Sequence, residues 1–494
     1  MPEPGVMSLM PVLATLIVAF GARNVLVGLF TGVFVGVALK AETSLVMFVP
    51  DLVKHYLVPQ VADSYNASVL VLLAFIGGFV RLIEYSGGGM AFARTASRWV
   101  AGPVRAQLGA WLGGIMIFFS DLGTPLIVGP VFQPLTQRLR ISGQKLAFIL
   151  DSTSSPVAIL IPFIGWGVFI MSVIADAFEI NNVTMSEWDA FVAAIPYQLY
   201  AWLAIAMVPV VVLMHADFGP MAAAENEART TNTHAARAPT EADNKARPVL
   251  VWLPLLVLGA TLFVTLGQLG FPFTQVAGAD FRAALAAAYF LAAVVLVVLI
   301  AATGVKGILE TFTKYIEGMT GMMSIAATLV LAWALGSVSE ALGTAVFVAD
   351  LARDGLSSEF LPAITFLLAA IISFATGSSW GTIIIMVPLA VPAALATGSP
   401  MPLTIGAVLS GGLFGDHSSP VSETTILSST GAGTTPLAHF GTQFPYATVN
   451  GGIAMAGFLL AGFYPIPWLV PLAVAVQIAV VLLIHRILIV RKGE

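Results

Sequence analysis

Hydrophobic residues dominate this chain and gather in long uninterrupted runs. Two of the longest, 252–269 and 283–303, are each about 20 residues long, which is the length of helix that crosses the core of a bilayer. A transmembrane β-barrel would instead show short segments in which polar and apolar positions alternate, and these runs do not alternate. The pattern therefore predicts an all-α polytopic membrane protein.

Two apolar segments differ from the other runs because they are interrupted near the middle. In both 106–137 and 361–396, each half is only about 13–15 residues, or ~20 Å of helix, which is too short for a hydrocarbon core of ~30 Å. We expect these two segments to be re-entrant hairpins. We expect crossing helices at roughly 7–21, 24–40, 67–86, 145–175, 191–214, 248–269, 281–302, 319–336, 402–430, 443–463 and 467–489.

A polar stretch without hydrophobic periodicity divides the crossings into two sets of five. Five is an odd number, so two such sets in tandem must face opposite ways across the membrane, as in the inverted repeats of secondary transporters. The predicted units are a first repeat, 1–215, with hairpin 106–137 and broken helix 145–175; a cytoplasmic linker, 216–247; a second repeat, 248–463, with hairpin 361–396 and broken helix 402–430; and an extra C-terminal helix and tail, 464–494.

Matching motifs support the repeat. Three short patterns occur in the same order in both halves, at separations of 256, 258 and 264 residues, and such self-similarity is typical of internal repeats. The patterns are E-x2-G in Glu84–Gly87 and Glu340–Gly343, G-T-x5-P-x3-P in Gly123–Pro134 and Gly381–Pro392, and SSPV in Ser154–Val157 and Ser418–Val421.

The charge distribution predicts how the chain is oriented across the membrane. The chain is 58% hydrophobic and only 10% charged, and it contains 21 lysine and arginine residues. With the linker in the cytoplasm, only Lys40, Lys54, Arg282 and Arg353 lie outside, which is the asymmetry of the positive-inside rule. We expect an external N-terminus, a cytoplasmic C-terminus and a place in the bacterial inner membrane. The first residues lack the basic region of a cleaved signal peptide.

Polar residues concentrate in two places that we expect to lie near the middle of the membrane. These are LDSTSSPVA, Leu150–Ala158, and GDHSSPVSETT, Gly415–Thr425. Pro156 and Pro420 would break their helices there, and lipid cannot satisfy the backbone groups that a break frees. The freed carbonyls and the neighbouring hydroxyls and carboxylates suit a hard cation such as sodium. Two facing sodium sites are therefore predicted, one in each half.

Acidic residues in these segments are the strongest candidates for function. A charge at the bilayer centre costs at least about 2.5 kcal/mol, so we expect Asp121, Asp151, Asp416 and Glu423 to be functional. His417 could carry a proton, although capping or packing is its commoner role, and the other five histidines are dispersed. Trp166 and Trp380 lie near the breaks, where they either pack or line a substrate pocket.

Other classes of protein fit less well. The chain has no cysteine, which excludes thiol chemistry. An intramembrane aspartyl protease would need Gly-x-Gly-Asp, but Leu413 stands at the first glycine position before Asp416. No HExxH motif of a zinc metalloprotease occurs. A channel is disfavoured because inverted repeats with broken helices are typical of transporters.

The chain resembles the NhaC family of sodium/proton antiporters, which belongs to the wider ion transporter superfamily. The stretches that carry the resemblance are FFSDLGTPLIVGP, QPLTQRLRISGQKLAFILDSTSSPVA, FATGSSWGTIIIMVPLAVP, FGDHSSPVSETTILSS and TQFPYA. The resemblance implies an elevator-type fold in which cations lie between each hairpin tip and the neighbouring broken helix. It also implies sodium/proton antiport, or alternatively sodium-coupled transport or exchange of a small organic solute such as a carboxylate or amino acid.

Two departures from the family pattern keep both alternatives open. Ser120 and Asp121 stand where many members have two acids, and Ser422 and Glu423 stand where serine and aspartate are usual. The resemblance implies no cofactor besides the coupling sodium and no nucleic-acid partner, and a homodimer is left open. The ion-binding residues carried over by motif are Asp121, Gly123, Thr124, Asp151, Ser152, Thr153, Ser155, Thr376, Ser378, Ser379, Thr382, Asp416, Ser418, Ser419, Glu423 and Thr424.

Overall fold

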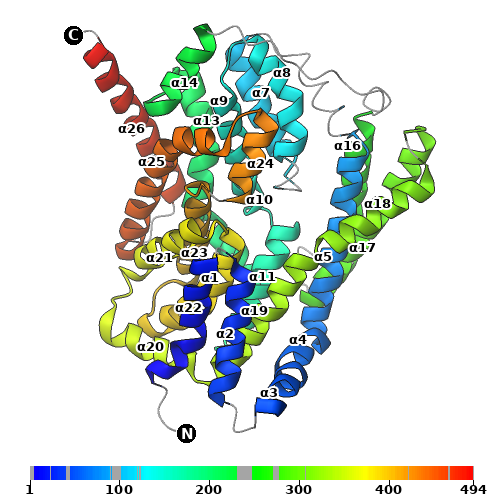
Figure 1. Ribbon diagram of the computed structural model, residues 1–494, viewed down its shortest axis with the longest axis vertical. Helices are drawn as coiled ribbons and strands as arrows, with labels where there is room; N and C mark the ends of the chain where they lie inside the picture. The colour runs from blue at the N-terminus through cyan, green and yellow to red at the C-terminus, as the bar shows by residue number, and fades with distance from the viewer. Residues whose placement is uncertain are drawn as a thin grey trace.

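In the computed structural model the described residues form helices and turns, with no strand among them (Figure 1). Seven helices are long and apolar enough to cross a membrane, or eight if the bent pair Glu187–Tyr197 and Leu199–Met214 is one span. The chain is therefore an all-helical multi-pass membrane protein, as the hydrophobic runs predict. The structure describes residues 5–22, 24–40, 45–88, 91, 102–118, 121, 124–230, 247–270, 278–305, 307–420, 422–464 and 468–492.

Long helices form one flank of the molecule (Figure 1). Helices α16 and α17 pack against each other, and α5 packs against both α17 and α18. On α16 the side chains of Leu256, Phe263 and Val264 are more than 60% exposed, as expected for a helix that faces lipid. The helices of this flank are α5 (Ser64–Tyr85), α16 (Val249–Gln268), α17 (Gly278–Ala302), and the continuous span of α18 (Ile308–Gly321) and α19 (Met323–Ala341).

Both segments that we expected to be hairpins consist of paired helices. The first comprises α7 (Pro103–Met116), a π-helical turn η3 (Thr124–Val128) and α8 (Gly129–Arg138). The second comprises α21 (Leu361–Thr376) and α22 (Ser379–Thr397), and α22, with 19 residues, is longer than expected. The first hairpin lies in the upper half of the molecule in Figure 1, and the second lies in the lower half.

The two proline-containing segments are interrupted helices. The first consists of α9 (Gly143–Ser152), a short α10 (Ser155–Ala158) and α11 (Gly165–Ile180), and the second of α23 (Met401–His417) and α24 (Glu423–Ala432). The two halves pack against each other. In the first hairpin, η3 and α8 contact α9 of their own half and α24 of the other half. In the second hairpin, α22 contacts α23 of its own half and α11 of the other half. Further elements are α12 (Glu187–Ala194), η4 (Ile195–Tyr197), α13 (Leu199–Met214), α25 (Pro436–Phe463) and α26 (Leu469–Lys492).

The predicted crossings at 7–21 and 24–40 are shorter helices in the structure. Helix α1 (Met10–Ala22) has 13 residues and α2 (Val25–Lys40) has 16, so they reach only about 20 and 24 Å. They pair closely, because a Cβ at Gly28 or Gly32 would overlap residues of α1. Their turn reaches the middle of the molecule, where Val25 packs against Gly381 of the second hairpin. Two full crossings are therefore the wrong description of this segment.

Several short elements were not predicted from the sequence. The chain between α2 and α5 forms α3 (Leu45–Asp51), a π-helical turn η2 (Leu52–Leu57) and α4 (Val58–Ala62). Helix α20 (Thr344–Gly355) packs against α22. These elements are too short to produce a long hydrophobic run, which was the signal that located the other helices. A 3₁₀ turn, η1 (Val6–Leu9), precedes α1.

The segment expected to be a linker contains a packed helix, α14 (Gly219–Thr230). Its Met221 and Glu225 are buried. The Glu225 carboxylate accepts a hydrogen bond from the backbone N–H of Ser142 at 2.8 Å, and Asp217, just before α14, forms an ion pair with the fully buried Lys145 of α9. A packed helix therefore occupies 219–230 of the expected linker, while 231–246 lies outside the described residues.

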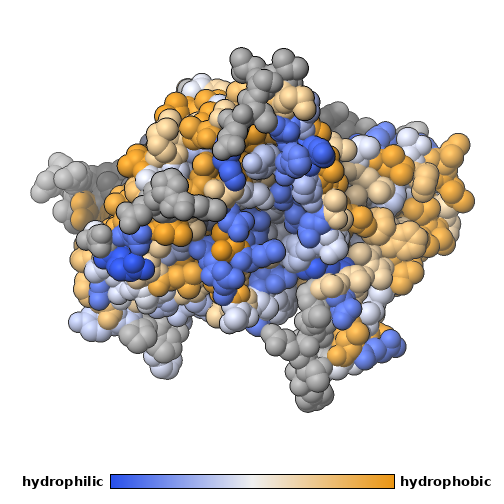
Figure 2. Space-filling model, turned by 90° about the horizontal axis from the view of Figure 1, so that it is seen from below, coloured by the Kyte–Doolittle hydropathy of each residue, from blue (hydrophilic) through white to orange (hydrophobic). Residues whose placement is uncertain are grey.

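The end of the molecule that carries α3, α4 and α20 has a polar centre. Figure 2 shows hydrophilic residues gathered in the middle of this face and hydrophobic residues along its flanks. This distribution fits a protein whose flanks face lipid and whose end face meets water.

Candidate functional site

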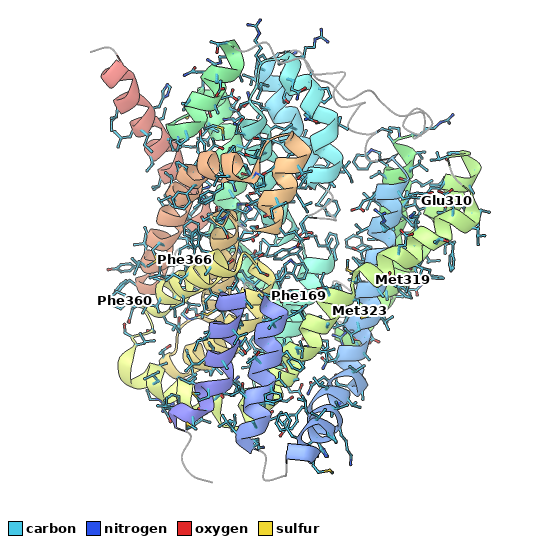
Figure 3. All side chains as sticks on the ribbon, in the orientation of Figure 1. Phe169, Glu310, Met319, Met323, Phe360 and Phe366 are labelled. Atoms are coloured by element: carbon cyan, nitrogen blue, oxygen red, sulfur yellow. The ribbon has the colours of Figure 1, made fainter. Side chains whose placement is uncertain are left out.

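A hollow with a volume of about 950 Å³ lies between the interrupted helices and the long helices of the flank. Both hairpin turns and both helix breaks contribute residues to its wall, and α5, α18 and α19 line the opposite side. Figure 3 shows Phe169 in the middle of the molecule, and Met319 and Met323 on the neighbouring α18–α19 span. The hollow is therefore the place where the separate motifs of the two halves meet.

The break between α23 and α24 holds a buried carboxylate. Asp416, 3% exposed, is the penultimate residue of α23, and Pro420 in the break cannot donate the N–H that would continue the helix. Ser422 donates a hydrogen bond to Asp416 Oδ1 at 2.7 Å, and Thr424 donates to Oδ2 at 3.4 Å. The break thus places two hydroxyl oxygens around one carboxylate at the edge of the hollow.

Side chains also satisfy the backbone at this break. Ser422 caps α24 by accepting from the N–H of Thr424 at 3.2 Å, as serine commonly does at helix N-termini. Thr425 donates to the carbonyl oxygen of Ser419 at 3.2 Å. Ser418 is buried and its hydroxyl has no partner among the described residues. The hydroxyl side chains of Ser422 and Thr425 therefore have a structural role at this break.

The break after α9 is built in a similar way. Thr153 donates to the carbonyl oxygen of Ile149 at 2.8 Å, and Ser154 accepts from the N–H of Ser155 at 2.6 Å. Pro156 occupies the first turn of α10, a position that tolerates proline. The Ser155 side chain is fully buried, lines the hollow and has a hydroxyl without a partner among the described residues. An unpaired buried hydroxyl in a cavity wall indicates a place for a ligand.

The turn of the first hairpin reaches the hollow through Asp121. The indole Nε1 of Trp166, at the start of α11, donates a hydrogen bond to Asp121 Oδ2 at 2.7 Å. Thr124, at the start of η3, is 1% exposed and lies away from the hollow wall. Gly123 lies outside the described residues.

The turn of the second hairpin is made by Gly377 and Ser378. Gly377 has φ +68°, a conformation that glycine adopts without the strain imposed by a Cβ. Ser378 caps α22 by accepting from the N–H of Gly381 at 3.2 Å, and its carbonyl oxygen accepts from the Thr382 hydroxyl at 2.9 Å. Next to this turn, Trp380 lies 4.5 Å from Trp166 between ring centroids, so aromatic side chains connect the two hairpin turns.

Asp151 lies in a fully buried cluster outside the hollow wall. Gln443 of α25 donates from Nε2 to Asp151 Oδ2, and Ser428 of α24 donates to Oδ1 at 3.4 Å. The Nε2 atom of His439 is 3.5 Å from Oδ2, and that of His417 is 4.0 Å from Oδ1. Mostly nitrogen atoms therefore surround this carboxylate, which is a different setting from the hydroxyl oxygens around Asp416.

Two residues of this cluster were not expected. The sequence analysis treated the histidines other than His417 as dispersed, but His439 packs beside it around Asp151. Gln443 belongs to the TQFPYA stretch, and a glutamine inside a long apolar helix was the signal that could have identified it. Among the described residues, no three His, Cys, Asp or Glu side chains are grouped to hold a metal ion together.

A charged network that the motifs did not indicate lines the side of the hollow opposite the breaks. Arg81 of α5 lies 3.4 Å from a carboxylate oxygen of Glu84 and 3.9 Å from one of Glu317 on α18. Asp121 lies close enough to Glu84, Asp416 and Glu423 to interact with each electrostatically. Carboxylates therefore predominate around the hollow.

The expected site residues divide into two groups. Those that line the hollow are Asp121, Ser155, Trp166, Thr376, Ser378, Ser379, Trp380, Asp416, Glu423 and Thr424. The structure places outside its wall Thr124, Asp151, Ser152, Thr153, Pro156, Thr382, His417, Ser418, Ser419 and Pro420. The two halves thus contribute unequally, because the hollow wall includes Asp416 from the second break but not Asp151 from the first.

The fold has a counterpart among solved structures. The YdaH transporter of Alcanivorax borkumensis superposes with a TM-score of 0.59, covering 92% of this chain and 98% of that one, at 15% sequence identity. At that identity the likeness establishes a shared fold alone.

Relatives found by sequence have higher sequence identity to this chain. An uncharacterized protein of Haemophilus influenzae is 30% identical over 479 residues, covering 93% of this chain and 91% of the relative. Two other similarities are short. The malate-2H(+)/Na(+)-lactate antiporter of Bacillus subtilis is 41% identical over 75 residues, 15% of this chain and 16% of that protein. The arginine/ornithine antiporter ArcD of Halobacterium salinarum is 39% identical over 109 residues, 21% of this chain and 22% of that protein.

The family assignment settles the class of protein. The last two of these relatives are named as antiporters, so the chain is a secondary transporter rather than an enzyme. The model of the Na+/H+ antiporter family matches residues 157–463. This range begins just after the first break and includes α11, the second hairpin, the second interrupted helix and α25. The chain therefore belongs to the Na+/H+ antiporter family.

Proposed function

We propose that the protein is a sodium-coupled antiporter that binds sodium at the break between α23 and α24. The observation that carries this proposal is the convergence of both hairpin turns and both breaks on one hollow. Asp416 supplies a carboxylate there, and Ser422 and Thr424 supply hydroxyl oxygens within hydrogen-bond distance of it. Oxygen ligands with one negative charge suit a hard monovalent cation.

Protons are the first candidate for the exchanged species. The carboxylate of Asp151 is fully buried and is surrounded by His417, His439 and Gln443. An imidazole beside a buried carboxylate can bind a proton, and the position of this cluster outside the hollow wall would separate proton binding from sodium binding. Family membership supports this candidate, because the family is named for sodium/proton exchange.

A small organic solute is the second candidate, and the size of the hollow favours it. A volume of about 950 Å³ lies in the range of pockets that hold organic ligands and far exceeds what one cation needs. Trp166, Phe169 and Trp380 give part of its wall an aromatic surface. Locally similar relatives are named as exchangers of malate and lactate and of arginine and ornithine.

The transport mechanism that we propose is alternating access with an inverted repeat. The paired motifs and the meeting of both hairpin turns at one hollow support the repeat. The flank of α5, α16, α17, α18 and α19 would be the fixed scaffold, and the hairpins with the interrupted helices would be the moving elevator unit. The hollow lies along the boundary between these two groups.

The positive-inside distribution supports the proposed orientation in a bacterial inner membrane. The linker and C-terminus would be cytoplasmic and the N-terminus external. The short α1–α2 hairpin keeps this orientation, because it enters and leaves on the same side as its neighbour α3 (Figure 1).

Purified protein in liposomes tests the proposed function. An imposed sodium gradient should drive the opposite movement of protons, measured with a trapped pH dye, or the accumulation of a labelled solute. Potassium should replace sodium poorly in either assay. Absence of any sodium-driven flux from vesicles whose protein binds sodium and is correctly inserted would contradict the proposal.

A further inference from the structure

The charge on the hollow wall is one-sided. Among the described lining residues, five carry carboxylates and only Arg81 is basic, and Arg81 already lies within 4 Å of two of these acids. Like charges in a partly desolvated site raise one another's energy unless cations compensate them. Sodium at Asp416 would compensate one charge. The charges of Asp121 and Glu423, which lie close enough to interact with each other, would remain uncompensated. The acids are Glu84, Asp121, Glu317, Asp416 and Glu423.

An aromatic surface lies beside these two acids. The ring centroids of Trp166 and Trp380 are 4.5 Å apart, and Phe169 lies 4.3 Å from Trp380. All three residues line the hollow, and Trp166 donates its indole N–H to Asp121. The faces of tryptophan rings attract ammonium and guanidinium groups, so carboxylate and aromatic surface here favour the same ligand charge.

A buried hydroxyl provides an independent indication of a ligand. Ser155 is fully buried, its Oγ has no partner among the described residues, and it lines the same hollow. A buried hydroxyl without a hydrogen bond carries a cost in free energy. A ligand with N–H groups would remove this cost, since the hydroxyl oxygen accepts from such a donor.

We infer that the exchanged solute is a small organic cation, in which an ammonium or guanidinium group lies between Asp121 and Glu423 and an aliphatic body lies against Trp166 and Trp380. This inference rests on the proposed sodium-coupled antiport and specifies its second candidate. A dicarboxylate would meet five acids and one already paired arginine, so the same wall excludes it. A bare cation would leave the aromatic surface and most of the volume without a function.

The test uses the purified full-length chain in liposomes that carry an imposed sodium gradient. Labelled lysine and cadaverine serve as cationic probes, leucine as a neutral amino acid, and malate as an anion. The expected result is sodium-dependent flux of at least one cationic probe, at a rate at least tenfold above that of malate. Preferential transport of malate, or of leucine over lysine and cadaverine, would overturn the inference.

Two pairs of variants locate the binding groups. Asp121→Asn and Trp380→Leu should each raise the KM for the cationic probe at least tenfold. The matched controls, Glu359→Gln and Trp252→Leu, alter an acid that is exposed on the surface and a tryptophan that is 39% exposed on α16, and they should transport like the unaltered chain. If Asp121→Asn and Glu423→Gln both kept the original KM, the assigned position of the cation would be wrong.

Failure of this inference can be distinguished from failure of the proposed function. Sodium-driven proton movement without flux of lysine or cadaverine would overturn the inference and leave sodium/proton antiport standing. Flux of a cationic probe that does not depend on sodium would support the cation site and contradict sodium coupling. Binding of cadaverine to the detergent-purified chain, measured by calorimetry, decides the case in which liposomes show no flux, because absence of binding also overturns the inference.

Discussion

Gln443 joins two parts of the chain by donating to the Asp151 carboxylate, 292 residues away in sequence. The same Nε2 group donates to the backbone carbonyl oxygen of His417 at 3.0 Å. One amide of α25 therefore holds the end of α9 and the end of α23, the two helices that stop at the breaks. The relative position of the breaks depends on this side chain.

Replacing this amide should destabilise the fold. Gln443→Leu has a similar size but removes one donor to the buried Asp151 carboxylate and the Gln443 donor to a buried carbonyl oxygen, and each buried acceptor left unsatisfied costs roughly 1–3 kcal/mol. The unfolding temperature in detergent should fall by several degrees. Gln268→Leu, at an exposed position near the end of α16, is the control and should leave the unfolding temperature unchanged. Equal unfolding temperatures for both variants would contradict the bridging role of Gln443.

Local features of the sequence predicted much of this fold. Long apolar runs located α5, α16, α17, α25 and α26, because each crossing helix needs its own hydrophobic length. The prolines and hydroxyl residues near Pro156 and Pro420 located the breaks, because a proline acts on its own helix. The short α1–α2 hairpin was misread, since its composition matches that of a crossing helix and only its length differs.

The arrangement of the site was harder to predict, because it depends on contacts between distant segments. Nothing near Asp151 in the sequence indicates His439 or Gln443 as its partners. Arg81 escaped notice because it lies on α5, outside every matching motif. Helix α14 was missed because the packing that orders it comes from Lys145 and Tyr446, on α9 and α25.

The ion pair between Lys145 and Asp217 should respond unequally to the loss of either partner. Lys145 is fully buried, whereas the Asp217 side chain is 19% exposed and also accepts a hydrogen bond from the Tyr446 hydroxyl at 2.9 Å. Asp217→Asn leaves a buried ammonium group with a weaker partner, and breaking a buried pair costs about 3–5 kcal/mol. Lys145→Met should cost less, because Asp217 keeps water and Tyr446.

Unfolding temperatures of the two single variants and the double variant measure this difference. The double variant should be more stable than the sum of the single effects predicts, since removing both charges leaves no buried group unpaired. Additive effects would show that Lys145 and Asp217 do not interact. A larger fall in unfolding temperature for Lys145→Met than for Asp217→Asn would contradict the finding that Lys145 is the more deeply buried partner.

Cysteine labelling tests the proposed orientation without background, because the chain has no native cysteine. Asn226→Cys lies on the exposed face of α14, and Thr184→Cys lies in the exposed turn after α11. In intact cells a membrane-impermeant maleimide should label Thr184→Cys rapidly and Asn226→Cys only after permeabilisation. The reverse result would place α14 outside the cell and invert the topology.

Asp416 and Asp151 should respond differently to conversion to asparagine, because only Asp416 lies at the hollow next to hydroxyl oxygens. Sodium that binds only the folded protein stabilises it by about 2.7 kcal/mol at a hundredfold excess over Kd. We expect Asp416→Asn to abolish this sodium-dependent rise in unfolding temperature, since asparagine removes the negative charge of the site. Ser422→Ala, which removes one hydroxyl ligand, should weaken the rise.

Asp151→Asn should retain most of the sodium-dependent stabilisation and lose coupled proton movement. Its side chain keeps the shape that contacts Gln443, but it lacks the negative charge that stabilises a proton on a neighbouring imidazole. Unfolding temperatures at graded sodium concentrations, followed by sodium-driven proton flux in liposomes between about pH 6 and 9, where imidazole groups change charge, separate the two effects. Loss of sodium stabilisation in Asp151→Asn would assign this residue to the sodium site, and unchanged proton flux would assign it a structural role. Only a variant that binds sodium without exchanging protons supports separate sites for the two ions.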